Sequence, residues 1–178
     1  NGKLQASSTG DASLHLSGAG TWGGWARVTN IDANDHILMH TSGASGYGLG
    51  HDTESQTTCS LDSVSVVAAG TTPVDAYMFN VCVWDGSNLK IYRDGKTAVS
   101  TAATAYTSTA TSFRVGATNV GYSMSGQVDE IGVTYGRAMT AAEICRWCSC
   151  GIRGEQCTCD GANPTLYIST GRNVGTAA

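Results

Sequence analysis

The chain has 178 residues, of which only 13% are charged, and its formal net charge is −4. This length suits one domain with a sizeable core plus an appendage. The weakly acidic balance excludes the basic surface that nucleic-acid binding needs, and no stretch approaches the roughly 20 apolar residues of a membrane span. The chain starts at Asn1 rather than Met, so we expect that something upstream was removed or not expressed; a cleaved signal peptide is one explanation.

The first half of the chain predicts strands separated by glycine-rich turns. "GAGTWG" (18–23) fits a dinucleotide-binding pattern, but "WGGWARV" continues as a strand and not as a helix, so we interpret it as a turn. Strands are expected at "TWGGWARVTN" and "HILMHTS", and "SGYGLGHD" predicts a glycine-loosened strand. "LDSVSVVAAG" (61–70) predicts another, with Val64 and either Val66 or Val67 facing the core.

The clearest local pattern is the meander "MFNVCVWDGSNLKIYRDGKTAVS". It predicts strands at 78–84, 89–93 and 97–100, joined by turns at Asp85-Gly86 and Asp94-Gly95, because Asp-Gly pairs supply the positive φ angles of tight hairpins. Two further strands are expected at "TSFRVGAT" and "SGQVDEIGVTYG". Turn signals recur about every 8–12 residues, which indicates a sandwich or a barrel.

One helix is expected, at about Thr140 to Ser149 in "RAMTAAEICRWC". Thr140 precedes Glu143 by three residues, which is the spacing of a capping box, in which each side chain satisfies a backbone amide of the other residue. Glycine at 151 suits the left-handed residue that ends many helices.

The run "VWDGSNLKIYRDGKTA", followed by "FRVGA" and "MSGQVDEIGVTYGRAMTAAEI", resembles the second half of a LamG-like jelly roll of the concanavalin A-like lectin/glucanase superfamily. The resemblance covers roughly 22–144. It implies an all-β fold, a two-sheet antiparallel jelly-roll β-sandwich. We therefore expect a jelly roll over 1–144, one short helix, and a Cys-rich C-terminal appendage and arm over 145–178.

Catalysis is not expected from the carboxylates. Glucanases of the superfamily use a Glu-x-Asp-x-x-Glu strand, and none of the four glutamates (Glu54, Glu130, Glu143, Glu155) stands in that arrangement. Adjacent Asp129 and Glu130 would point to opposite faces of a regular strand. The four histidines have no metal-ligand spacing and are interpreted as structural or exposed.

Asp129 is a candidate calcium ligand. Alternation places it on one face with Ile131, Val133 and Tyr135, so it should point inward, where a carboxylate needs a partner or a cation. The resemblance implies a structural calcium at this position, with Asp11 and Gly43 as further candidate contributors. The alternative is that Asp129 caps a turn through backbone amides.

Four aromatic residues are candidate sugar-stacking residues: Trp22, Trp25, Tyr47 and Trp84. The alternative for each is core packing, because aromatics dominate sandwich interiors. Trp22 and Trp25 are three residues apart and should point to opposite faces of their strand.

Seven cysteines raise three interpretations: disulfides, a zinc site or a redox centre. Five lie between Cys145 and Cys159, also including Cys148, Cys150 and Cys157, and zinc is the less favoured reading because the spacers do not match usual zinc ribbons. Pairing of Cys145 and Cys148 with Cys157 and Cys159 is expected, and Cys59 and Cys82 could bridge two strands. One cysteine is then left over, which suggests intermolecular pairing or a free thiol.

These observations predict a non-catalytic, extracellular recognition module that binds a glycan or a surface protein. The alternative is a structural subunit of an extracellular assembly, such as a surface appendage or a virion decoration or fibre protein, in which copies of the chain or other subunits are the partners. For that role we expect Asp160 to Ala178 to form an arm, with a strand at "TLYIST" (165–170).

Overall fold

A computed structural model describes residues 4–6, 15–31, 36–42, 45–52, 55–107, 113–116, 124–150, 157 and 159. The expected arm and its strand at 165–170 lie outside the described residues. None of the helices in the described part is long and apolar enough to cross a membrane.

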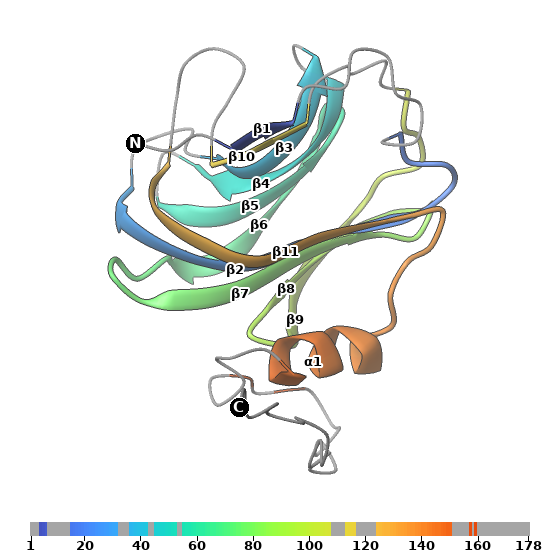
Figure 1. Ribbon diagram of the computed structural model, residues 1–178. Helices are drawn as coiled ribbons and strands as arrows, with labels where there is room; N and C mark the ends of the chain where they lie inside the picture. The colour runs from blue at the N-terminus through green and yellow to red at the C-terminus, as the bar shows by residue number, and fades with distance from the viewer. Residues whose placement is uncertain are drawn as a thin grey trace, which may run out of the picture.

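Two antiparallel sheets face each other, as the sequence predicts (Figure 1). In spatial order, the six-stranded sheet consists of β1 (Leu4–Ala6), β10 (Phe113–Val115), β3 (His36–Ser42), β4 (Ser45–His51), β5 (Gln56–Leu61) and β6 (Val64–Thr71). The five-stranded sheet consists of β11 (Ser125–Tyr135), β2 (Gly20–Asn30), β7 (Tyr77–Trp84), β8 (Asn88–Arg93) and β9 (Lys96–Ala102).

The meander is confirmed as β7, β8 and β9, with positive φ at Gly86, Asp94 and Gly95 in its two turns. The Asp85 carboxylate shapes the first turn by accepting hydrogen bonds from the amides of Ser87 (3.0 Å) and Asn88 (2.8 Å). Local turn chemistry therefore sets this part of the five-stranded sheet.

The prediction of a single strand over 61–70 was wrong. β5 ends at Leu61, the turn at Asp62 and Ser63 reverses the chain with φ of 48° at Asp62, and β6 begins at Val64. Asp62 holds the turn because its carboxylate accepts the Gly46 amide hydrogen bond (2.7 Å). The inward placement of Val66 and Val64 is confirmed, since Val66 belongs to the core and partly buried Val64 packs against it.

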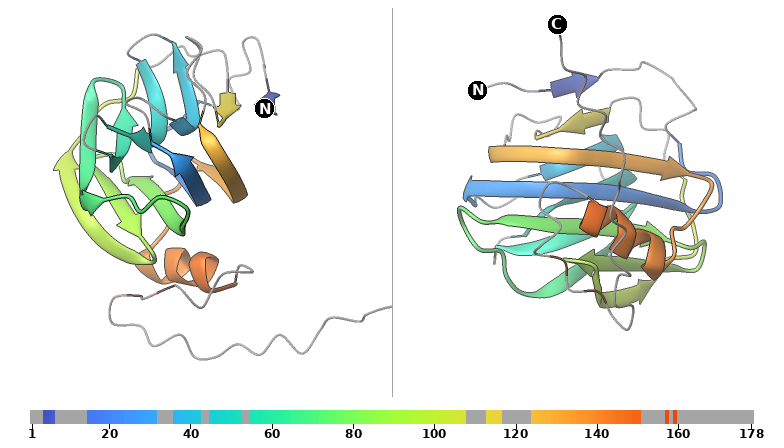
Figure 2. Two further views of the ribbon diagram at one scale, coloured as in Figure 1. Left: turned by 90° about the vertical axis from the view of Figure 1, so that its left-hand side faces the viewer. Right: turned by 60° about the horizontal axis from the view of Figure 1, so that its bottom comes forward.

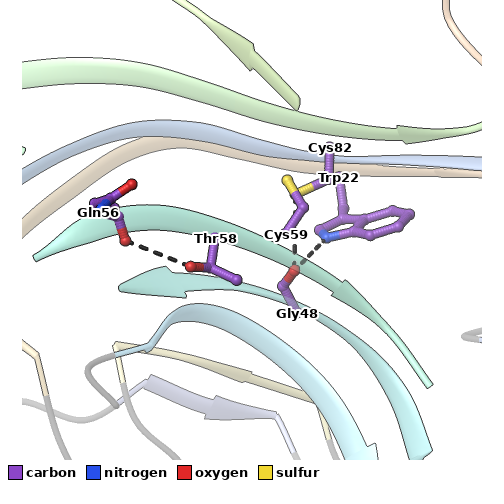
Figure 3. The surroundings of a disulfide bond; sticks show 6 residues. All are labelled: Trp22, Gly48, Gln56, Thr58, Cys59 and Cys82. Carbon is purple, nitrogen blue, oxygen red and sulfur yellow. Dashed lines mark hydrogen bonds between the residues drawn. A yellow bond between two sulfur atoms is a disulfide. The ribbon is translucent and has the colours of Figure 1, made fainter. Parts of the chain in front are cut away.

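The main core lies between the sheets, and an inter-sheet disulfide crosses it. Cys59 of β5 bonds to Cys82 of β7, with 5.7 Å between their Cα atoms, and both residues are fully buried. Figure 3 shows the Trp22 indole beside this bond, donating from Nε1 to the Gly48 carbonyl oxygen of β4 at 3.0 Å. Covalent and hydrogen-bonded links thus join the two sheets at the same place.

Helix α1 (Ala141–Cys150) covers the outer face of the five-stranded sheet (Figure 1). Its capping box is confirmed: the Glu143 amide donates to Thr140 Oγ1 (3.3 Å), and the Thr140 amide donates to Glu143 Oε2 (2.8 Å). Ile144 and Cys148 lie on the buried face of α1 and pack in a second core with side chains of β2, β7 and β8. This sheet is therefore buried on both faces where the helix lies.

Candidate functional site

A cleft of about 500 Å³ lies at the open edge of the sandwich, between β10 of one sheet and β11 of the other. β11 is the last strand of its sheet, and Figure 2 shows it next to β10 in both views. Of the residues that the structure describes, nine line the cleft: Phe113, Val115, Val128, Asp129, Glu130, Ile131, Gly132, Val133 and Tyr135.

The lining combines an apolar surface with a few polar groups. Phe113, Val115 and Tyr135 are half-buried, so each still presents part of its side chain to solvent. An end strand also carries backbone amides and carbonyls that no neighbouring strand pairs. A largely apolar concavity with a few convergent polar groups is the usual character of a small-molecule site.

A β-bulge in β11 shapes this cleft. Asp129 is opposite Trp25 and Gly132 is opposite Gly23, so Glu130 and Ile131 together face the single residue Gly24. Glu130 has a φ of 50°, a left-handed conformation that costs a non-glycine residue about 1–3 kcal/mol. Bulges of this kind re-aim side chains and occur often beside functional sites.

Gly24 makes the bulge possible. A Cβ atom at Gly24 would lie 2.7 Å from the Glu130 carbonyl oxygen and 2.9 Å from Ile131 Cα, which is closer than real Cβ contacts. Gly24 also has a φ of +148°, within the region that favours glycine. Gly24 of "TWGGWARV" therefore serves the register of β11, whereas its neighbour Gly23 makes room for the backbone of β7 at Asn80 and Val81.

The bulge corrects the prediction that Asp129 points inward. Asp129 does not share a face with Ile131, Val133 and Tyr135: those three pack toward the main core together with Val128, whereas Asp129 is paired opposite Trp25 of the second core. Glu130 stands with Ile131 at the next position of the ladder, opposite Gly24, and both acidic residues belong to the cleft lining. Regular alternation fails here because two residues of β11 occupy one position of its ladder.

Behind the cleft wall lies a row of buried aromatic residues. His40 is the ladder partner of both Phe113 and Tyr47, and the His40 and Tyr47 ring centroids are 5.1 Å apart. The hydroxyl groups of Tyr47 and Tyr135 are 3.3 Å apart. Burial, followed by this hydrogen bond, raises the pKa of Tyr47, so its hydroxyl stays protonated. Tyr135 thus connects the cleft surface to the core.

Two buried histidines, His40 and His51, have no hydrogen-bond partner for either ring nitrogen among the described residues. Burial lowers the pKa of His40 to about 4, and nearby His15 adds to this effect. Burial also lowers the pKa of His51 to about 4; Arg93 contributes in the same direction, while Asp52 opposes it. Both rings are therefore neutral at pH 7, and they fit the structural interpretation of the histidines.

The four aromatic residues predicted to stack on sugars are core residues. Trp22 and Tyr47 are 0% exposed, Trp25 is 1% exposed and Trp84 is 4% exposed. Trp22 and Trp25 do point to opposite faces, but α1 buries the outer one. This burial confirms core packing and removes the four as sugar-stacking candidates, since a ring without exposed surface cannot meet a sugar. The exposed aromatic surface of the cleft comes from Phe113 and Tyr135, which the sequence did not single out.

The calcium site stays a prediction. Asp129 lies in the cleft, whereas the candidate ligands Asp11 and Gly43 lie outside the described residues. No group of three or more His, Cys, Asp or Glu side chains suited to a metal occurs in the described part of the chain. Calcium would need six to eight oxygen ligands, many of them backbone carbonyls.

The cysteines form disulfides, as the favoured interpretation predicts. Cys145 pairs with Cys159 and Cys148 with Cys157, so α1 is tied to the segment that follows it. These four thiols are not available to zinc. Cys150 is the unpaired cysteine, and it is exposed.

A second, smaller cavity of about 280 Å³ lies beside the β5–β6 turn, with Asp62, Ala103 and Thr107 among its lining residues. The Asp62 carboxylate there already accepts hydrogen bonds from the Gly46 amide, the Thr107 amide (2.7 Å) and the Thr107 hydroxyl (3.1 Å). Its polar group serves the fold, so the edge cleft is the better candidate site.

Comparison with solved structures supports the same fold. The chain is similar to the CBM40 of the Ruminococcus gnavus IT-sialidase bound to α2,3-sialyllactose (TM-score 0.61, 12% identity, 81% of this chain and 95% of that chain). It is similar to domain 4 of AbnA, a GH43 extracellular arabinanase from Geobacillus stearothermophilus, in complex with arabinotriose (TM-score 0.60, 13% identity, 89% and 83%). A heptameric SAP-like pentraxin from Limulus polyphemus also matches (TM-score 0.56, 11% identity, 85% and 84%).

No curated protein matches the chain. At the identities above, the solved structures establish the fold alone. The family comparison goes further, because the Laminin_G_3 model matches residues 1–145, most of the chain. Together with the two antiparallel sheets, this match shows that the chain belongs to the concanavalin A-like lectin/glucanases superfamily.

Proposed function

We propose that the protein is a non-catalytic carbohydrate-recognition module that binds a glycan in the edge cleft between β10 and β11. The observation that carries this proposal is the cleft itself, whose lining includes half-buried Phe113 and Tyr135 together with Asp129 and exposed Glu130. Sugars present apolar C–H faces and hydroxyl groups. Aromatic and aliphatic side chains suit the former, and carboxylates and unpaired backbone groups of an edge strand suit the latter.

The similar structures support the ligand class. The CBM40 is bound to sialyllactose and the arabinanase domain to arabinotriose, so this sandwich architecture holds oligosaccharides in other proteins. Fold alone does not determine function, and the proposal therefore depends on the chemistry of the cleft.

We place the module outside the cell. The described residues contain three disulfides, and such bonds persist in oxidising compartments and rarely in the cytosol. Binding without catalysis agrees with the missing Glu-x-Asp-x-x-Glu strand.

An oligosaccharide array, followed by titration calorimetry on the best ligands, tests the proposal. Two cleft variants, Phe113→Ala and Val115→Ala, should weaken binding, the first by about tenfold because an aromatic contact is lost. Val74→Ala is the matched control, since Val74 is 51% exposed on the β6–β7 connection and lies outside the cleft. Its affinity should equal that of the unmodified protein.

Three results would overturn parts of the proposal. An array without any bound glycan removes the function. Binding that is unchanged in folded Phe113→Ala and Val115→Ala proteins removes the cleft as the site. Release of reducing sugar from a bound glycan, abolished by Glu130→Gln, would make the protein a hydrolase and not a binding module.

A further inference from the structure

We propose that the edge cleft selects neutral or amine-bearing glycans over acidic ones, and that Glu130 is the residue that determines this preference. The inference rests on the proposed function, since it concerns which glycans the same cleft accepts. Two observations support this preference: the charge of the cleft and the backbone conformation at Glu130.

The first observation is an unbalanced negative charge. Asp129 and Glu130 both line the cleft, and no lysine, arginine or histidine occurs among its described lining residues. Arg114 lies between Phe113 and Val115 in β10 but is absent from the lining, because alternation turns it to the other face of the strand. Two further arginines are engaged elsewhere: Arg27 with Asp75 and Arg137 with Glu143.

The second observation concerns the backbone at Glu130. Among the described residues, five non-glycine residues have positive φ: Ser55, Asp62, Asp75, Asp94 and Glu130. The first four are serine or aspartate outside the strands, whereas Glu130 lies within β11. Aspartate tolerates this conformation because its short side chain bonds the local backbone, and glutamate has no such advantage.

The bulge therefore presents a carboxylate at a position where glycine would fit the backbone better. Gly24 on the neighbouring strand leaves the room that this conformation needs. The Glu130 side chain is exposed within the cleft lining, so its carboxylate is free to meet a ligand. A residue retained against its backbone preference at a cleft is best explained by what its side chain does there.

The expected selectivity follows from elementary electrostatics. A carboxylate accepts hydrogen bonds from sugar hydroxyls and attracts an ammonium group, but it repels a uronate or sialate carboxylate. At about 4 Å in water, one such repulsion weakens binding by about fivefold, and more where water is excluded. The Glu130 carboxylate should thus disfavour an acidic glycan by about fivefold or more.

The test uses three trisaccharides of one linkage: a neutral hexose, the corresponding uronic acid and the corresponding amino sugar. Calorimetry at low salt should give the order amino sugar, neutral sugar, uronic acid for the unmodified protein. Glu130→Gln should bring the affinities for the uronic acid and the neutral sugar closer by about fivefold. Asp75→Asn is the matched control, because Asp75 also has positive φ and an exposed carboxylate but lies outside the cleft.

A second variant separates recognition from folding. Glu130→Gly should raise the melting temperature, because glycine adopts this φ without strain, and should lower the affinity for the neutral ligand at least threefold. Preference for the uronic acid, or a Glu130→Gln protein with unchanged selectivity, would overturn the inference while leaving glycan binding intact. If none of the three trisaccharides and none of the glycans on the wider array binds, both proposals are overturned together.

Discussion

Replacing Cys59 and Cys82 together with alanine should destabilise the sandwich more than any other pair of cysteine substitutions. These residues join β5 of one sheet to β7 of the other, are fully buried, and lie beside Trp22 in the main core (Figure 3). Their removal takes away a cross-link and also the sulfur atoms that fill the space between the sheets.

The magnitude follows from the loop that the bond closes. A sequence separation of 23 residues corresponds to about 3 kcal/mol of chain entropy removed from the unfolded state. Truncating two buried side chains adds about 1 kcal/mol for each lost sulfur. A loss of about 4–5 kcal/mol is a large part of the 5–15 kcal/mol that stabilises a typical domain, and it should lower the melting temperature by about 10 °C or more.

Urea unfolding followed by tryptophan fluorescence measures this loss, because Trp22 and Trp84 belong to the core between the sheets. The control is the Cys145/Cys159 double alanine variant. Its loop, with a separation of 14, also corresponds to about 3 kcal/mol, but it ties α1 to the segment that follows and does not cross the core between the sheets. It should leave the sandwich transition nearly unchanged. A Cys59/Cys82 variant within about 1 kcal/mol of the unmodified protein, or equal losses in both variants, would refute the reasoning.

Four further predictions concern other parts of the molecule. The fold lowers the pKa values of His40 and His51 from 6.5 to about 4, so as the pH falls the unfolded chain binds protons at these residues before the folded chain does. The free energy of unfolding should therefore be at its full value above pH 6.5 and fall between pH 6.5 and 4. Urea midpoints that stay constant from pH 7 to 5 would contradict this. Gly24→Ala should cost about 2 kcal/mol or more, because its Cβ would collide with β11; an unchanged melting temperature would show that the bulge relaxes freely. A thiol titration of the native protein should find one reactive group per chain, absent in Cys150→Ser, and a covalent dimer on a non-reducing gel would instead show that this cysteine joins two chains. Calcium at Asp129 predicts a melting temperature that falls on adding a chelator and no longer does so in Asp129→Ala; equal values in both proteins, with and without chelator, would exclude it.

Much of the fold could be predicted from local sequence patterns. The Asp-Gly turns specify the β7–β8–β9 meander, and Thr140 with Glu143 specifies the start of α1. Both signals act over a few residues, through positive φ angles and through backbone amides that need partners. Proximity along the chain likewise favours bonds between the cysteines of α1 and those that follow it, but it does not decide which cysteine, Cys150, stays unpaired.

The candidate site depends on contacts that are distant in the sequence. Nothing in the sequence around Trp25 indicates that its side chain is buried. It is buried because α1, more than 100 residues later in the sequence, packs against the outer face of its sheet. The bulge at Glu130 exists only against Gly24 of β2, and the cleft needs β11, an edge strand of one sheet, to lie beside β10, which is paired between β1 and β3 in the other. Alternation and turn chemistry are local properties that the sequence by itself determined. Register, edges and the covering of a face result from long-range pairing, and only the tertiary structure decided them.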